Sequence, residues 1–207
     1  MKSLLLSMTA VAAWAAGPQV VFTKSFPGSS PAYVHITVDK SGATTYKETP
    51  DDDPETFTIE PAAAEAIFDL AEKMGRFKIN LESGLKVAKM GDKTFRWENG
   101  GEASEAKFNY SLDENAKVLL DWFERISESE RNFITLRRAM RFDKLGVNDA
   151  VIRIDNMLAQ KRYVGTAQLL LVLDRVAANE TFLHMARERS AELATAIRSA
   201  TKANPAP

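Results

Sequence analysis

The stretch Ala32-Tyr-Val-His-Ile-Thr-Val-Asp39, followed by Lys40-Ser41-Gly42 and Thr44–Glu48, decides the fold. Its valines and its isoleucine occupy every second position, which predicts a half-buried β-strand. Lys40-Ser41-Gly42 has turn chemistry, because glycine tolerates the positive φ that a tight hairpin needs. Thr44–Glu48 then returns as the second arm. The stretch therefore predicts an antiparallel hairpin.

The flanking sequence extends this hairpin into a sheet. Gln19–Lys24 and Thr56–Ile59 are further apolar strands, and a second hairpin, Asp92–Glu98 with Ala103–Tyr110, surrounds Asn99-Gly100-Gly101. Between them a helix begins at Pro61, where a missing N–H costs nothing, and ends near Gly75. Residues 78–91 have apolar side chains without a period, and form either a lid over a cleft or a surface crossing.

The second half of the chain has helical periodicity. One long helix or two stacked helices are expected over residues 114–142, with Leu119, Trp122, Phe123 and Ile126 on one face. We expect three more helices: one capped by Asn148 and ending near Gln160, a centrally buried one over Gly165–Val176, and a last one capped by Asn179 or Thr181 that carries Phe182, Met185, Leu193 and Ile197.

These patterns predict an α+β protein in two parts. An N-terminal antiparallel sheet with one or two packed helices spans residues 18–127. A C-terminal all-α helical bundle spans residues 128–201, and residues 202–207 are expected to be a disordered tail.

The first fifteen residues have the pattern of a secretory signal peptide. Lys2 precedes an apolar run, and Ala13-Trp14-Ala15 supplies a small-x-small exit before Ala16. The run is too short to span a bilayer, which needs about 20 apolar residues. The sequence therefore predicts an exported protein with no membrane span.

The chain of 207 residues has no cysteine and a formal net charge of −1. The missing cysteines exclude disulfides, thiolate nucleophiles and a lipid-modified cysteine, which favours a bacterial periplasmic or secreted protein over a small disulfide-rich animal module. The balanced charge supports neither nucleic acid nor an anionic membrane as a partner. We expect no cofactor, and an envelope protein or a small ligand as partner, with the oligomeric state open.

One carboxylate cluster is a candidate metal site. Asp51, Asp53 and Glu55 offer oxygens of the kind that calcium binds, but neighbouring side chains in an extended loop point apart and no glycine provides the sharp turn of a calcium loop. The alternative is a solvated acidic loop. Arg137, Arg138, Arg141 and Lys144 lie on one side of a helix and face either an acidic partner or the acidic first half of this chain.

Motifs of familiar enzymes are missing from the sequence. There is no G-x-S-x-G elbow, P-loop or dinucleotide-binding glycine fingerprint. His35 and His184 have no partners at metal-ligand spacing. We therefore expect no catalytic residues, and the alternative is a hydrolase that uses two placed carboxylates.

The first half resembles a family of exported bacterial domains of unknown function. Members have a G-x-C-P-x-Y turn, matched by Gly28-Ser29-Ser30-Pro31-Ala32-Tyr33, and a hairpin matched by Asp39, Gly42 and Tyr46. Ser30 stands where the family usually has cysteine. The resemblance covers residues 18–127 and implies no catalytic residues. On physical grounds alone, Tyr33 and Tyr46 are predicted to pair across the hairpin.

Three functions are consistent with these patterns. The first is an exported, non-enzymatic binding or scaffold protein of the bacterial cell envelope, and we favour it. The second is a cell-envelope hydrolase that uses carboxylates. The third is an interaction module whose helices, residues 128–201, dock an envelope partner.

Overall fold

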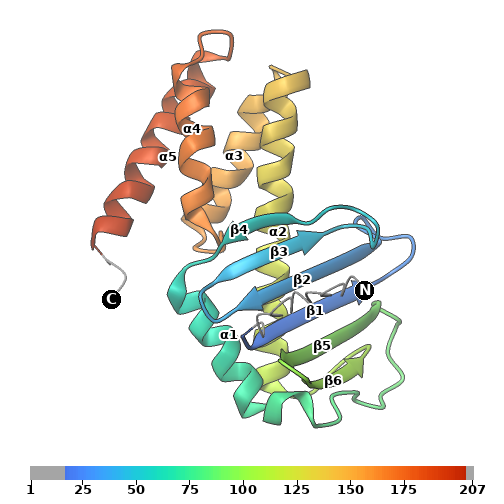
Figure 1. Cartoon of the computed structure of the whole chain (residues 1–207). Helices are drawn as coiled ribbons and strands as arrows, with labels where there is room; N and C mark the ends of the chain where they lie inside the picture. Colours follow the sequence, from blue (N-terminus) through green and yellow to red (C-terminus); the bar gives the residue numbers. More distant parts are fainter. Residues whose placement is uncertain (1–16, 204–207) are drawn as a thin grey trace, which may run out of the picture.

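Six antiparallel strands form one sheet in the order β4-β3-β2-β1-β5-β6. The computed structural model describes residues 17–203, and Figure 1 shows the sheet with its helices. The strands are β1 (Gln19–Ser25), β2 (Tyr33–Asp39), β3 (Ala43–Lys47), β4 (Glu55–Thr58), β5 (Asp92–Asn99) and β6 (Glu102–Phe108). Their agreement with the predicted ranges confirms the N-terminal antiparallel sheet.

The turn between β2 and β3 shows why this hairpin forms. The Asp39 carboxylate accepts hydrogen bonds from the N–H groups of Ser41 and Ala43 at 2.8 and 2.9 Å. Gly42 has a φ of +85°, and a Cβ there would lie 2.7 Å from the carbonyl oxygen of Ile59. Glycine is therefore required at this turn.

The predicted pairing of Tyr33 with Tyr46 is wrong. Tyr46 lies opposite Ile36, and Tyr33 lies opposite Ser25 of β1. Because side chains alternate along a strand, Tyr33 and Ile36 project to opposite faces of β2. Tyr46 is in the core, whereas Tyr33 is only partly buried.

Two helices, α1 (Pro61–Lys73) and α2 (Glu114–Phe142), cover the apolar face of the sheet. In Figure 1, α2 crosses behind the strands. The rings of Phe22 and Phe123 stack with centroids 5.0 Å apart, and Phe95 lies 5.7 Å from Phe22. This aromatic cluster attaches α2 to the sheet. A short 3-10 helix, η1 (Gly75–Phe77), follows α1.

The region over residues 114–142 is one helix, not two stacked helices. Its first half contributes Leu119, Phe123 and Ile126 to the core under the sheet. Its second half contributes Phe133 and Leu136 to a separate core in the bundle. A single helix therefore crosses the predicted boundary between residues 127 and 128.

Three further helices complete the C-terminal bundle: α3 (Gly146–Ala159), α4 (Leu169–Ala178) and α5 (His184–Ala203), with a short 3-10 helix, η2 (Thr166–Gln168), before α4. The helices run as two hairpins, α2 with α3 and α4 with α5, whose turns lie at the same end of the molecule (Figure 1). Sheet followed by helices is the predicted α+β fold.

Several predicted helix ends in the bundle are wrong. Asn148 does not cap α3; the helix begins at Gly146, whose N–H donates to the Asp143 carboxylate at 3.0 Å. The helix expected from Gly165 begins only at Leu169, because η2 takes the first turn, and it is not buried all round, since Leu171 is 60% exposed.

The last helix begins later and ends later than predicted. It starts at His184, so Phe182 precedes it, and Met185 is exposed instead of inward-facing. Lys202 and Ala203 belong to α5, so the predicted disordered tail does not begin at residue 202. Residues 204–207 and the predicted signal peptide, residues 1–15, lie outside the described residues. Within residues 17–203 no helix is both long and apolar enough to cross a membrane.

Candidate functional site

Glu60 connects the sheet to the bundle. Its main-chain carbonyl accepts hydrogen bonds from the N–H groups of Ala63 and Ala64, as at a helix N-cap. Its carboxylate accepts hydrogen bonds from the N–H groups of Gly165 and Thr166 at 2.9 and 2.8 Å, and from the Thr166 hydroxyl at 2.8 Å. One side chain thus ties the start of α1 to the segment that leads into α4.

Arg125 of α2 makes a second connection. Its guanidinium donates to the carbonyl oxygens of Arg162 and Lys161, at 3.2 and 2.9 Å, and lies over the Trp122 ring, 4.2 Å from the centroid. Arg162 in turn donates to Asp121 at 3.1 Å. These contacts hold the loop after α3 against the middle of α2.

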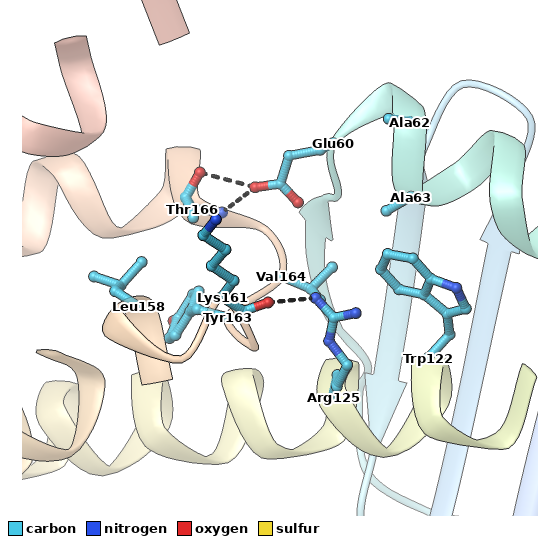
Figure 2. A pocket seen from close by; sticks show the side chains of 10 residues that line it. All are labelled: Glu60, Ala62, Ala63, Trp122, Arg125, Leu158, Lys161, Tyr163, Val164 and Thr166. Carbon is cyan, nitrogen blue, oxygen red and sulfur yellow. Dashed lines mark hydrogen bonds between the residues drawn. The ribbon is translucent and has the colours of Figure 1, made fainter. Parts of the chain in front are cut away.

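A cavity of about 460 Å³ lies between these two connections. Figure 2 shows Glu60 and the loop residues on one side and Trp122 with Arg125, both from α2, on the other. Tyr163, Val164 and Leu158 complete much of the apolar lining. Glu60, Thr166 and Arg125 are engaged in the bonds described above, whereas the Lys161 side chain is exposed at the edge of the cavity.

A larger groove of about 700 Å³ continues from this cavity, because Glu60, Ala62, Leu158 and Thr166 line both. The groove lies between α5 and the start of α1. Its apolar lining residues are Ile59, Pro61, Ala62, Leu158, Ala167, Leu193, Ala196, Ile197 and Ala200. The remaining lining residues are Thr58, Glu60, Glu65, Thr166 and Thr201, so no basic side chain lines it. Concave, mostly apolar sites of this size are typical of small-molecule binding.

A buried carboxyl group lies close to the cavity. Glu130 of α2 is 1% exposed, and its carboxylate accepts one hydrogen bond, from the Gln168 amide at 2.9 Å. Burial raises the pKa of Glu130 to about 7. Burial also raises the pKa of Tyr163, with the negative charges of Glu130 and Glu60 adding to the effect. The Tyr163 hydroxyl has no hydrogen-bond partner within the described part of the chain.

Glu130 has the raised pKa of a general acid but not the position of one. It does not line the cavity or the groove described above. A proton donor has to come within hydrogen-bond reach of its substrate. The geometry therefore supports a structural carboxyl group at this position.

The predicted calcium candidates do not assemble into a site. Asp51 and Asp53 are exposed in the loop before β4, and Glu55 instead accepts a hydrogen bond from the Arg137 guanidinium at 2.8 Å. Among residues 17–203, no group of three or more histidine and acidic side chains is placed to hold a metal ion.

The basic residues on α2 divide between two environments. Arg137 pairs with Glu55, so this residue faces the acidic first half of the chain. Three further basic residues are exposed near the end of α2: Arg138, Arg141 and Lys144.

The two histidines lie far from each other in the fold. His35 is on the open face of the sheet, where burial lowers its pKa and the Lys47 charge lowers it further, and His184 is exposed on α5. The two histidines belong to different parts of the fold.

Sequence reasoning missed Glu60, which connects the sheet to the bundle, and the buried Glu130. Glu60 directly precedes Pro61, the predicted first residue of a helix, and that position was the available signal for an N-cap. Its contact with Thr166 has no local signal, because the two residues are far apart in the chain. Glu130 looks in the sequence like one more acidic residue on a helix rich in charge.

Comparison with known proteins identifies no relative of this chain. A scan of protein-family models, a search of curated proteins and a search of solved structures all find no match to this chain.

Proposed function

We propose that this chain is an exported, non-enzymatic binding protein of the bacterial cell envelope, and that it holds an elongated apolar ligand in the groove between α1 and α5. The groove itself carries this proposal: about 700 Å³, apolar in most of its lining, and formed by both halves of the molecule. Export is supported by the signal-peptide pattern of residues 1–15.

The shape of the lining favours an apolar chain as the ligand body. Ala62, Ala167, Ala196 and Ala200 present small side chains that allow close approach from both walls. Burial of an apolar chain is favourable by about 25 cal/mol for each Å² removed from water. Leu193 and Ile197 supply much of the bulk on the α5 side.

The polar lining determines the kind of head group. The carboxylate of Glu60 already accepts three hydrogen bonds, whereas Glu65 is exposed at the edge of the groove. The groove is lined by Glu60 and Glu65 and by no basic residue, since Arg125 and Lys161 line only the adjoining cavity, so an acidic head group in the groove would meet negative charge. A ligand with an uncharged or cationic head fits best.

The hydrolase alternative needs two available carboxylates. Glu60 and Glu65 are the acidic residues that line the groove, and Glu60 is engaged in tying α1 to the segment before α4. A carboxylate with three donors is poorly placed to act as nucleophile or base, because those bonds would have to break first. The geometry therefore favours binding over hydrolysis.

Filling the groove tests the proposal. Ala196→Trp on α5 places a large ring in the groove, and Ser199→Trp is the control on an exposed position of the same helix that does not line it. We expect the Kd of the neutral apolar dye N-phenyl-1-naphthylamine to rise at least about tenfold in A196W, or about 1.4 kcal/mol. It should change little in S199W.

Equal dye binding by A196W, S199W and the parent chain would overturn the groove as the binding site. Far-UV circular dichroism shows whether each variant keeps its helices. Native mass spectrometry of the chain purified after export tests the rest of the proposal: a mass starting at Ala16 supports the leader, and a mass starting at Met1 contradicts it.

A further inference from the structure

Residues 78–91, which join η1 to β5, form an exposed apolar segment without helix or strand. Four large apolar side chains lie in it at high exposure: Ile79 at 41%, Leu85 at 52%, Val87 at 41% and Met90 at 56%. Figure 1 shows the segment running along the outer edge of the molecule beside β5 and β6. Apolar side chains concentrated in one exposed segment indicate an interaction surface.

The segment is held in place by the end of β6. The Asn109 side chain accepts a hydrogen bond from the Met90 N–H at 2.7 Å and donates to the Ala88 carbonyl at 3.2 Å. The Ser83 N–H donates to the Tyr110 carbonyl at 2.9 Å. The exposed apolar side chains are therefore displayed from a positioned backbone.

All cations of the segment are lysines. Lys78, Lys86 and Lys89 are exposed, and two of them alternate with the apolar side chains of Leu85, Val87 and Met90. The acidic residue of the segment, Glu82, uses its carboxylate to accept the Asn109 N–H at 2.6 Å. Lys89 also pairs with Asp92, directly after the segment, at 3.0 Å, whereas Lys78 and Lys86 make no ion pair within residues 17–203. Residues 78–92 therefore have a net charge of +1, carried by exposed lysines, in a chain whose overall formal charge is −1.

We propose that residues 78–91 dock the protein onto the surface of an anionic lipid bilayer. The apolar side chains enter the boundary of the acyl chains while the neighbouring lysines contact the head groups. Interleaved lysine and apolar residues suit a lipid surface with anionic head groups. A protein partner fits less well, because lysine is depleted in protein–protein interfaces, where arginine is enriched.

A single fluorescent label tests this docking. The chain has no cysteine, so Val87→Cys can be labelled uniquely with the environment-sensitive nitrobenzoxadiazole group. Asn156→Cys, exposed on α3, is the matched control. With vesicles containing about 30% phosphatidylglycerol in phosphatidylcholine, we expect fluorescence at position 87 to rise about threefold as the probe leaves water, and no rise at position 156.

Lysine reversal separates charge from apolar contact. The double change K86E and K89E in the V87C chain should abolish the rise, and so should 0.5 M NaCl, because the attraction to the head groups is electrostatic. Both labelled chains are used as the form that begins at Ala16, so the apolar leader does not contribute to the signal. An unchanged signal at position 87 overturns the proposal and leaves a protein partner for the surface. An equal rise with phosphatidylcholine alone overturns the requirement for anionic lipid.

Discussion

Glu130 is a carboxyl group enclosed by protein with one hydrogen-bond donor. Removing an ionised carboxylate from water is costly unless a partner compensates it. The Gln168 amide compensates it only partly, and burial raises the pKa from 4.5 to about 7. Glu130 therefore makes the stability of the fold depend on pH.

The direction of this dependence follows from proton binding. Between pH 4.5 and about 7 the folded state holds a proton on Glu130 that the unfolded state has lost, so stability falls as pH rises. Above pH 7 Glu130 is ionised in both the folded and the unfolded state. Burying this charge then lowers the free energy of unfolding by about 3 kcal/mol, which corresponds to the shift of the pKa from 4.5 to about 7. Glu130→Gln should therefore raise the free energy of unfolding by about 2 kcal/mol at pH 8 and hardly at pH 5.

Thermal unfolding at the two pH values checks this expectation. Glu124→Gln, an exposed site on the same helix, removes one charge without changing burial and is the control. An equal gain at pH 5 and pH 8 would contradict the role of Glu130.

Two buried tyrosines make a matched comparison. The Tyr46 hydroxyl donates to the Glu48 carboxylate at 2.8 Å, whereas the Tyr163 hydroxyl is buried without a partner in the described residues. Tyr46→Phe should cost about 1 kcal/mol, because it removes a bond and leaves an acceptor. Tyr163→Phe should cost nothing or stabilise slightly, because it removes an unpaired polar group. Urea unfolding of both variants decides whether this ordering holds.

At the scale of elements, Glu60 links α1 to η2 and α4. Glu60→Ala removes three hydrogen bonds to a carboxylate and leaves the Gly165 and Thr166 N–H groups unpaired. We expect a loss of about 3 kcal/mol in the free energy of unfolding, since bonds to charged groups are worth more than neutral ones. Glu65→Ala, exposed one turn later in α1, should change it by less than about 0.5 kcal/mol. Equal effects of the two changes in chemical denaturation would show that the link is not significant.

Elements whose signals are local could be predicted from the sequence. The alternation of β2 and the glycine turn after it are properties of neighbouring residues, and so is the start of α1 at Pro61. The features that the sequence did not predict depend on which of two nearby residues starts a helix, or on contacts between residues far apart in the chain. Asn148 is a good capping residue, but the Asp143 carboxylate accepts the Gly146 N–H, and α3 starts three residues earlier than a helix capped by Asn148 would.

The candidate site was not predictable because it is made by contacts distant in the chain. Glu60 meets Thr166, and the groove pairs the start of α1 with the far end of α5. No local period encodes such a meeting. The irregular segment 78–91 gave no period because its backbone is held by Asn109 and Tyr110 instead of by a helix or a strand ladder.

For the whole molecule, two apolar cores share one helix, α2. The contacts of Glu60 and Arg125 add further links between the sheet and the bundle. Units joined by a continuous helix and by buried hydrogen bonds are expected to unfold together.

A substitution in one core tests this coupling with a reporter in the other. Trp97 and Trp122 both pack in or against the core under the sheet, whereas Leu173 is fully buried in the bundle. Leu173→Ala should cost about 3 kcal/mol and lower the denaturation midpoint of tryptophan fluorescence together with that of circular dichroism. A fluorescence transition that stays in place while the helical signal moves would mean that the two cores unfold separately.

The continuity of α2 also has a consequence in time. All six strands lie before residue 109, but Phe123, whose ring stacks on Phe22, is synthesised only after them. The core under the sheet therefore lacks the stacked ring of Phe123 until the middle of α2 has been made, and Val164, buried in the same core, follows after α3. Thr166 is synthesised later still. More than a hundred residues therefore separate the synthesis of Glu60 from that of the residue whose N–H its carboxylate accepts. The order of synthesis thus completes the sheet first, and α5 then completes both the bundle core and the groove.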